Sequence, residues 1–312
     1  MNDIKYGRKR KGIKKELDSV INDWLLTIEN EDLVKLIEKN IIVTGGSIAS
    51  MLLGEPVNDF DFYFRNKETV KAVAEYYADK FNKNHIVKTN GAAPYTPVIK
   101  EETITNIKGE EEERVIIFIK SAGIAAEEQD DYSYFETMSE DAAIEFVESM
   151  TEKEKKEKYR VSFLSQNAIS LTDKIQIIIR FYGEPDSIHD NYDFQHACCY
   201  YDYADKNLHL DPDAMECLLS RTLVYRGSLY PIASIFRMKK FLERGWRITA
   251  GQQLKIMWQI SEIDLSDFGI LREQLTGVDL AYMWQLIEAL KNVNPEKINS
   301  AYVSAIIDKI FD

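Results

Sequence analysis

The stretch that most constrains the fold of this chain is an apolar run that leads into a glycine turn. Residues 41–44 are Ile-Ile-Val-Thr, residues 45–47 are Gly-Gly-Ser, and residues 59–62 are Asp-Phe-Asp-Phe. Apolar residues over 48–53 indicate a short helix between the turn and the second motif. The sequence therefore predicts a buried strand, a tight turn, a short helix and a second strand.

The turn has the chemistry of an anion-binding loop. Gly45 and Gly46 carry no Cβ, so the backbone there can approach a ligand closely. Backbone N–H groups at the start of a helix point toward an anion, and the Ser47 hydroxyl adds a further donor. We therefore expect Gly45, Gly46 and Ser47 to bind phosphate groups.

The second motif has the chemistry of a metal site. In a strand, alternation places Asp59 and Asp61 on one face and Phe60 and Phe62 on the other. Two carboxylates side by side repel each other unless a cation lies between them. Since Mg²⁺ prefers few carboxylates together with substrate phosphates, the two motifs together predict a site for a nucleoside triphosphate and Mg²⁺.

In this order and spacing, Gly45-Gly46-Ser47 and Asp59-Phe60-Asp61 resemble the signature of the DNA polymerase β-like nucleotidyltransferase superfamily. That superfamily includes tRNA nucleotidyltransferases and poly(A) polymerases. The resemblance implies an α+β fold with a mixed sheet flanked by helices. It also implies two divalent ions, Mg²⁺ or Mn²⁺, and transfer of a nucleoside monophosphate from an NTP such as ATP to an acceptor hydroxyl. Asp59 and Asp61 would be the metal ligands and catalytic acids.

The superfamily also uses a third carboxylate on a neighbouring strand. Our candidate is Asp193, which lies between two aromatic residues at the start of a predicted strand over 193–203, with Asp190 and Asp202 as rivals. Arg180 ends a predicted strand over 175–179, and from there its guanidinium could bind triphosphate oxygens.

Charge gives mixed information about a nucleic-acid partner. The net charge of −13 repels nucleic acid overall, but the positive charge is clustered in an N-terminal arm and again after residue 220. Arg237, Lys240 and Arg244 would share the polar side of a helix over 229–244. This second cluster slightly favours RNA, such as a tRNA or another 3′ end, as the acceptor; a protein or a small molecule is the alternative.

The pattern along the chain predicts two domains. Residues 1–207 would form the nucleotidyltransferase-like domain, with the basic arm and an acidic insertion over about 121–160, and residues 208–312 an all-helical domain. Asp211 and Pro212 predict the first helix start of the second domain.

The sequence also gives expectations about the cellular compartment, the origin of the protein and a function other than catalysis. No apolar run approaches membrane-spanning length, and three cysteines without a disulfide framework favour a cytoplasmic protein, in the host cytoplasm if a phage encodes it. The resemblance, taken with the many tyrosines, the long acidic insertion and the unusual domain elaboration, suggests a virus or phage lineage. The alternative to an enzyme is an inactive module that binds a nucleotide or a partner on the same fold.

Overall fold

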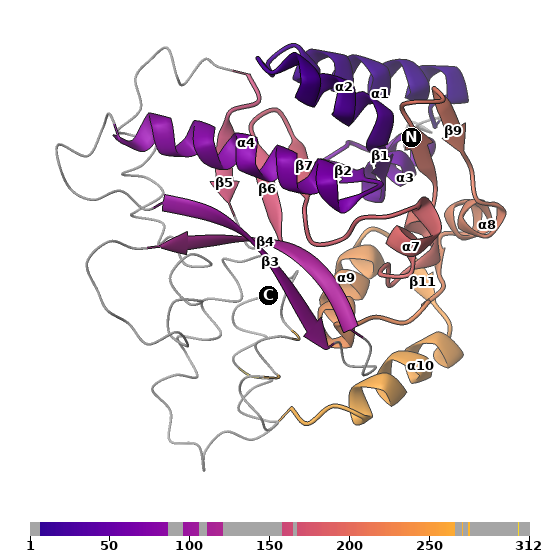
Figure 1. Cartoon of the computed structure of the whole chain (residues 1–312). Coiled ribbons are helices and arrows are strands. Elements are labelled where there is room, and N and C mark those ends of the chain that lie inside the picture. Colours follow the sequence, from indigo (N-terminus) through magenta and orange to yellow (C-terminus); the bar gives the residue numbers. More distant parts are fainter. Residues whose placement is uncertain are drawn as a thin grey trace.

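The computed structural model describes residues 7–86, 96–105, 111–120, 158–164 and 167–265, together with residues 270, 274 and 305 (Figure 1). The helices are α1 (Arg10–Leu25), α2 (Glu31–Asn40), α3 (Gly46–Leu53), α4 (Lys67–Ile86), α7 (Pro185–His189), α8 (Pro212–Ser220), α9 (Pro231–Glu243) and α10 (Ala250–Ser261), with a 3-10 turn, η2 (Gln195–Ala197). The strands are β1 (Ile41–Thr44), β2 (Phe60–Phe64), β3 (Thr96–Thr105), β4 (Glu111–Lys120), β5 (Val161–Leu164), β6 (Ala168–Leu171), β7 (Ile175–Ile178), β8 (Tyr200–Asp202), β9 (Asn207–His209), β10 (Thr222–Leu223) and β11 (Arg247–Ile248).

Seven of these strands form one mixed sheet in the order β5-β6-β7-β2-β1-β8-β9. β2 and β7 are parallel, whereas the other neighbouring strands in the sheet are antiparallel. Helices α1, α2 and α4 lie together along one side of this sheet (Figure 1). The arrangement confirms the predicted α+β class with a mixed sheet flanked by helices.

Alternation along β2 separates the core from the site. Phe60, Phe62 and Phe64 are buried in one hydrophobic cluster with residues of α1, α2 and α4. Trp24 of α1 packs on Phe62 with ring centroids 5.1 Å apart. Because successive side chains of a strand point to opposite faces, Asp61 is directed to the face away from these helices.

A buried hydrogen bond joins α1 to α4 within this core. The Trp24 indole N–H donates to the Tyr77 hydroxyl over 2.6 Å, and both side chains are fully buried. The neighbouring Tyr76 hydroxyl instead accepts from the Glu29 backbone N–H at an exposed position, over 3.4 Å. The two tyrosines therefore differ in how much each hydroxyl contributes to stability.

The N-terminal arm and the C-terminal region show both agreement and difference. The predicted basic arm enters α1, where Arg10 donates to the Asn207 side chain and to the Leu208 carbonyl over 2.8 and 2.7 Å. Asp211 caps α8 as predicted, accepting from the Ala214 N–H over 2.7 Å. The expected boundary between residues 207 and 208 falls inside β9, and the division into two domains stays a prediction.

The strand predicted over 193–203 is replaced by shorter elements. The structure has η2 at Gln195–Ala197 and a strand only at Tyr200–Asp202. Likewise, β10 and β11 pair in parallel between the C-terminal helices, where the sequence indicated helices alone. Most of the predicted acidic insertion, and most of the expected all-helical domain after residue 265, lie outside the described residues.

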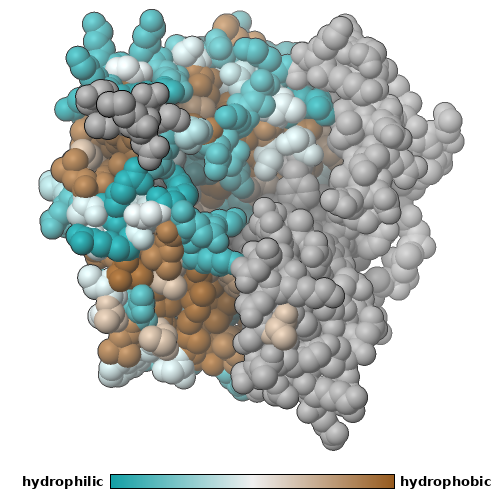
Figure 2. All heavy atoms as spheres, turned by 180° about the vertical axis from the view of Figure 1, so that it is seen from behind, coloured by the Kyte–Doolittle hydropathy of each residue, from teal (hydrophilic) through white to brown (hydrophobic). Residues whose placement is uncertain are grey.

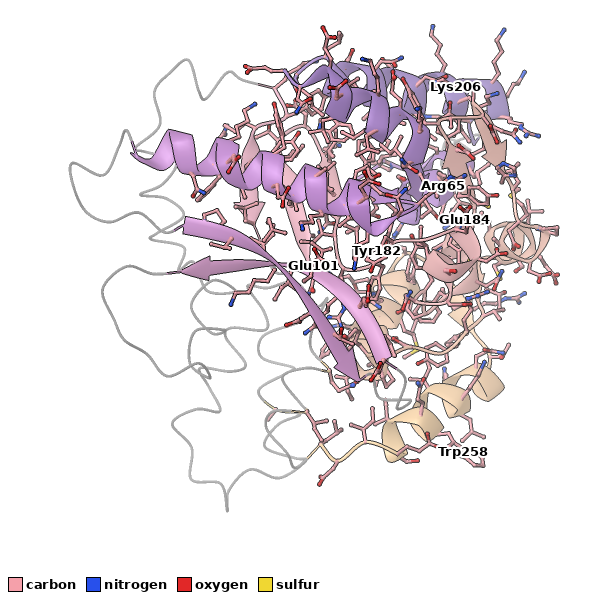
Figure 3. The ribbon with its side chains drawn as sticks, in the orientation of Figure 1. Arg65, Glu101, Tyr182, Glu184, Lys206 and Trp258 are labelled. Carbon is pink, nitrogen blue, oxygen red and sulfur yellow. The ribbon has the colours of Figure 1, made fainter. Side chains whose placement is uncertain are left out.

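The surface near the sheet carries ion pairs, whereas the surface of α10 exposes hydrophobic side chains. Arg65 forms ion pairs with Glu184 and Asp202 at 3.2 and 2.5 Å, so β2, α7 and β8 are held together (Figure 3). From behind, hydrophobic side chains gather in the lower part of the described surface (Figure 2). On α10, Met257 and Trp258 are exposed. No helix among the described residues is long and apolar enough to cross a membrane.

We expect Tyr77→Phe to lower the free energy of unfolding by about 1–3 kcal/mol, because it leaves the buried Trp24 N–H without this acceptor. Tyr76→Phe is the matched control and should change it by less than about 0.5 kcal/mol, since its bond is exposed. Urea unfolding of both variants tests the difference. Equal losses would show that the buried bond is not the stabilising contact.

Candidate active site

The turn after β1 has a conformation that only glycine adopts easily. Gly45 has φ of +93°, and a Cβ at this position would lie 3.1 Å from Asp61 Oδ2 and 3.3 Å from the Tyr192 hydroxyl. Gly46 begins α3, and a Cβ there would meet nothing within 4 Å. Gly45 is therefore required by backbone geometry and by the closeness of Asp61, whereas Gly46 leaves open space in front of the helix.

The start of α3 provides donors beside this space. The first N–H groups of an α-helix have no acceptor within the helix, and the helix dipole favours an anion there. Ser47 is buried, yet its Oγ has no hydrogen-bond partner in the part of the chain that the structure describes. A buried hydroxyl without a partner costs free energy, so this oxygen is poised for a ligand.

The register of three neighbouring strands places polar side chains in one row. Thr44 of β1 lies opposite Asp61 of β2, and Asp61 lies beside Gln176 of β7. Ser170 of β6 and Tyr200 of β8 continue the row on either side. Since the row is on the face away from the buried phenylalanines, it forms the floor on which a polar site can be built.

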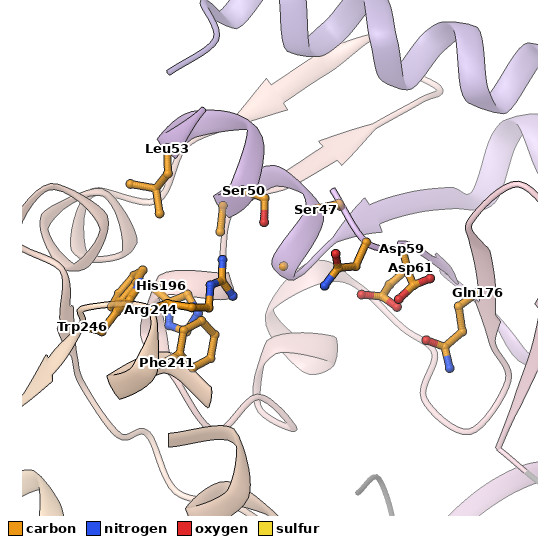
Figure 4. A pocket seen from close by; sticks show the side chains of 13 residues that line it. Ser47, Ser50, Leu53, Asp59, Asp61, Gln176, His196, Phe241, Arg244 and Trp246 are labelled. Atoms are coloured by element: carbon orange, nitrogen blue, oxygen red, sulfur yellow. The ribbon is translucent and has the colours of Figure 1, made fainter. Parts of the chain in front are cut away.

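A pocket opens above this row (Figure 4). From α3 come Gly46, Ser47, Ala49, Ser50 and Leu53; the other lining residues are Asn58, Asp59, Asp61, Gln176, His196, Phe241, Arg244 and Trp246. Asp59, Asp61 and Gln176 lie together at one end, and we call them the acid end. The structure thus brings together five of the predicted site residues: Gly46, Ser47, Asp59, Asp61 and Arg244.

The electrostatics of the acid end distinguish its two carboxylates. Asp59 is exposed, whereas Asp61 is half-buried. Burial, and secondly the negative charge of Asp59, raise the pKa of Asp61 to about 7. In the absence of a cation, Asp61 is therefore protonated over a wide pH range in which a carboxyl group is ordinarily ionised.

A buried polar layer supports Asp61 from below. The Thr44 hydroxyl lies 2.8 Å from His189 Nε2, and burial lowers the pKa of His189 to about 4, so its ring is neutral near pH 7. Burial and the Asp61 charge also raise the pKa of the Tyr63 and Tyr192 hydroxyls, which stay protonated. Among the described residues, no positive charge contributes to the pKa of Asp61.

The acid end fits a divalent cation that takes only a few of its ligands from the protein. Asp59 and Asp61 offer carboxylate oxygens, and Gln176 offers a neutral carboxamide beside them. Among the described residues, no group of three or more His, Cys, Asp or Glu side chains forms a metal site. Mg²⁺ commonly takes one or two protein carboxylates and completes its shell with water and substrate phosphates, so two carboxylates suffice.

The structure does not bring the predicted third carboxylate to the pocket. Asp193 is buried and forms an ion pair with Arg237 at 2.5 Å, and it does not line the pocket. The rivals are also elsewhere: Asp202 pairs with Arg65, and Asp190 lies 3.6 Å from Arg226. The position beside Asp61 on the neighbouring strand holds Gln176, which is uncharged.

The predicted basic residues have separate environments. Arg180 is buried, with its guanidinium 5.3 Å from the Phe181 ring centroid and 5.1 Å from that of Tyr230, away from the pocket lining. Arg237 forms an ion pair with Asp193, and Lys240 is exposed. Arg244, which we expected to contact nucleic acid, lines the pocket and pairs with Glu55.

Sequence reasoning missed several lining residues. Gln176 lies in a strand that the pattern predicted, and its place opposite Asp61 depends on pairing between strands far apart in the chain. His196, Phe241 and Trp246 come from η2, α9 and the segment that follows α9. No local motif links these three, and only the packing of the C-terminal region against α3 brings them to the pocket.

We expect Gly45→Ala to lower the free energy of unfolding by about 1–3 kcal/mol, because of its positive φ and the nearby Asp61 oxygen. Gly46→Ala is the matched variant: it should keep stability, since alanine fits the helix, but weaken Mg·ATP binding by about tenfold by filling pocket space. Urea unfolding and calorimetric titration measure both effects. A loss of stability in Gly46→Ala, with unchanged binding, would contradict this assignment.

We expect Asp61→Asn to stabilise the metal-free protein more at pH 8 than at pH 5. In the folded protein Asp61 holds its proton up to about pH 7, whereas the unfolded chain loses it near pH 3.8. The unfolded chain holds fewer protons between these values, so the wild-type free energy of unfolding falls as the pH rises toward 7. The full difference corresponds to about 4 kcal/mol, and solvent contact reduces the expected effect to about 1–2 kcal/mol.

Unfolding by urea in the presence of EDTA, at both pH values, tests this expectation. An effect of Asp61→Asn that is the same at pH 5 and pH 8 would show that Asp61 titrates normally.

Comparison with solved structures finds CCA-adding enzymes, the tRNA nucleotidyltransferase class that the motifs resemble. A Thermotoga maritima CCA-adding enzyme complexed with tRNA is 16% identical, over 92% of this chain and 54% of that chain, with a TM-score of 0.38. A CCA-adding enzyme in complex with ATP is 15% identical, over 93% and 50%, with a TM-score of 0.39. The chain therefore spans about half the length of these structures.

Comparison with protein sequences gives a family. No curated protein matches this chain. The model of the Gabija anti-defense 2 family matches residues 15–221, about two thirds of the sequence, and this stretch includes β1, the Gly-Gly-Ser turn, α3, Asp59 and Asp61. The chain belongs to the Gabija anti-defense 2 family.

Proposed function

We propose that the pocket binds an NTP with Mg²⁺ or Mn²⁺ and transfers its nucleoside monophosphate to an acceptor hydroxyl. One observation carries this proposal: the acid pair, Asp59 and Asp61, and the open N-terminus of α3 line the same pocket. Phosphate donors and metal ligands thus face one space, which is the requirement for holding a metal-bound triphosphate.

Four residues that line the pocket have a role in this proposal. Gly46 and Ser47 bind triphosphate oxygens through backbone N–H groups and the Ser47 hydroxyl. Asp59 and Asp61 hold two divalent ions, which, when bound, neutralise charge on the attacking and leaving oxygens. The acceptor oxygen forms a bond to the α-phosphorus, the bond from that phosphorus to pyrophosphate breaks, and the hydroxyl proton is lost to water.

RNA remains the first candidate for the acceptor, and a protein or a small molecule is the second. Support for RNA comes from the exposed cations Lys240 and Arg247 near the wall of the pocket that α9 provides. The cluster available for RNA is smaller than the sequence indicated, because Arg237 is held by Asp193.

The family description supports a biological setting for this chemistry. We infer that nucleotide transfer by this chain serves to counter the Gabija defense named in that description. A phage-encoded protein acting in the host cytoplasm fits this setting.

A second candidate is a module that binds a nucleotide or a partner without turnover. Gln176 favours this second candidate, because the position beside Asp61 on the neighbouring strand holds a neutral side chain and not a third carboxylate. With one negative charge fewer than a triad of acids, the pocket would hold a second divalent ion less strongly. The two carboxylates argue for the enzyme, since a pocket without a cation gains nothing from their repulsion.

A transfer assay separates the two candidates. With each α-labelled NTP, Mg²⁺ or Mn²⁺, and RNA or protein fractions of a host extract, we expect label to enter one fraction. The double variant Asp59→Asn/Asp61→Asn should reduce incorporation to background, because it removes the metal ligands. Asp190→Asn is the control: it removes an exposed acid outside the pocket and should leave incorporation unchanged.

Nucleotide binding that is independent of metal, without label transfer to any fraction, would favour the binding module. Transfer that persists in the folded double variant would overturn the assignment of the acid pair.

A further inference from the structure

The pocket has two ends of different chemistry, and the proposed function uses only the acid end and the neighbouring Gly46–Ser47 turn. The opposite end is built from His196, Phe241, Arg244 and Trp246, which we call the aromatic wall (Figure 4). Ser47 and Ser50 of α3 lie between the two ends in the same view. A molecule bound at the acid end would therefore extend along α3 toward aromatic side chains.

The rings of the aromatic wall pack edge to face. The centroid of His196 lies 4.5 Å from that of Phe241, at an interplanar angle of 78°, and 4.7 Å from that of Trp246, at 52°. His196 and Trp246 are buried, whereas Phe241 is half-buried and Arg244 is exposed. Phe241 and Arg244 thus present the accessible π surface and cation of this wall.

Arg244 is held in place on this surface. Its guanidinium lies 5.3 Å from the Phe241 ring centroid and forms an ion pair with Glu55, just beyond the end of α3. Arg221 also pairs with Glu55, at 2.9 Å, but does not line the pocket. Because bases stack on aromatic rings and on guanidinium planes, a fixed Phe241–Arg244 pair forms a platform suited to a planar base.

Two buried polar atoms of the aromatic wall have no hydrogen-bond partner among the described residues. Trp246 Nε1 and His196 Nδ1 have no hydrogen-bond partner among the described residues, as is also true of Ser47 Oγ. These three atoms belong to side chains that line one pocket. Buried polar atoms of this kind are rare because each costs free energy, and a ligand with polar edges would satisfy them.

We propose that the aromatic wall is a nucleobase subsite, in which a base stacks on Phe241 and Arg244. This inference rests on the proposed nucleotide-binding function. The base belongs either to the NTP whose phosphates occupy the acid end or to the last nucleotide of an RNA acceptor. Glu55 and the Gly46–Ser47 turn lie at opposite ends of α3, so this one helix fixes the distance between the base and the phosphates.

The test compares nucleotides with a ligand that has no base. Calorimetric titration measures the binding of the Mg²⁺ complexes of ATP, CTP, GTP, UTP and inorganic tripolyphosphate. We expect Phe241→Leu and Arg244→Gln to weaken binding of at least one NTP by about tenfold, the lower range for a stacked base, and to leave tripolyphosphate binding unchanged. Arg221→Gln breaks the neighbouring contact to Glu55 outside the pocket and should change neither.

A second measurement does not depend on the folding of Phe241→Leu. Mg·NTP should quench tryptophan fluorescence of the wild-type protein, and Trp246→Phe, which keeps the other three of the four tryptophans, should lose that quench. If instead the variants weaken only a short oligoribonucleotide, the base comes from the acceptor, and the subsite stands.

Equal weakening of NTP and tripolyphosphate binding would overturn the subsite while leaving the acid end intact. So would folded variants that bind both the NTPs and a short oligoribonucleotide as tightly as the wild-type protein. If the wild-type protein binds neither NTP nor tripolyphosphate and transfers no label, the proposed function itself fails. The tripolyphosphate arm therefore distinguishes the two failures.

Discussion

The register between β1, β2 and β7 is the constraint on which the pocket depends. Side chains alternate along a strand, so a slip of one residue would turn Asp61 into the core and a phenylalanine into the pocket. The phenylalanines of β2 fix the register, because they pack into one buried hydrophobic cluster with Trp24 of α1 and Tyr77 of α4. Hydrophobic packing on one face thus sets the electrostatics of the other.

The parts of the site within one local segment could be predicted from the sequence. The Gly45–Ser47 turn and the acids at 59 and 61 lie in a single strand, turn, helix and strand unit, where spacing and alternation determine which side chains share a face. The class of fold was predicted from the family resemblance that this unit carries, and not from spacing and alternation.

Contacts between distant segments could not be predicted in this way. Asp193 has the local pattern of a strand acid, but an arginine 44 residues later pairs with it. Gln176 has no chemical signature in its own strand, and only parallel pairing places it beside Asp61. Phe241 shows the periodicity of a helix face, yet that periodicity does not say whether the face meets a core or a ligand.

The origin of the two ends of the pocket has an evolutionary consequence. The acid end lies within residues 15–221, the stretch shared with the family, whereas Phe241, Arg244 and Trp246 lie beyond it. The acid pair and three of the four residues of the aromatic wall are thus encoded by separate stretches of sequence that meet only in the folded chain. Substitutions in the later stretch can therefore change the shape of one end of the pocket without altering either carboxylate at the other end.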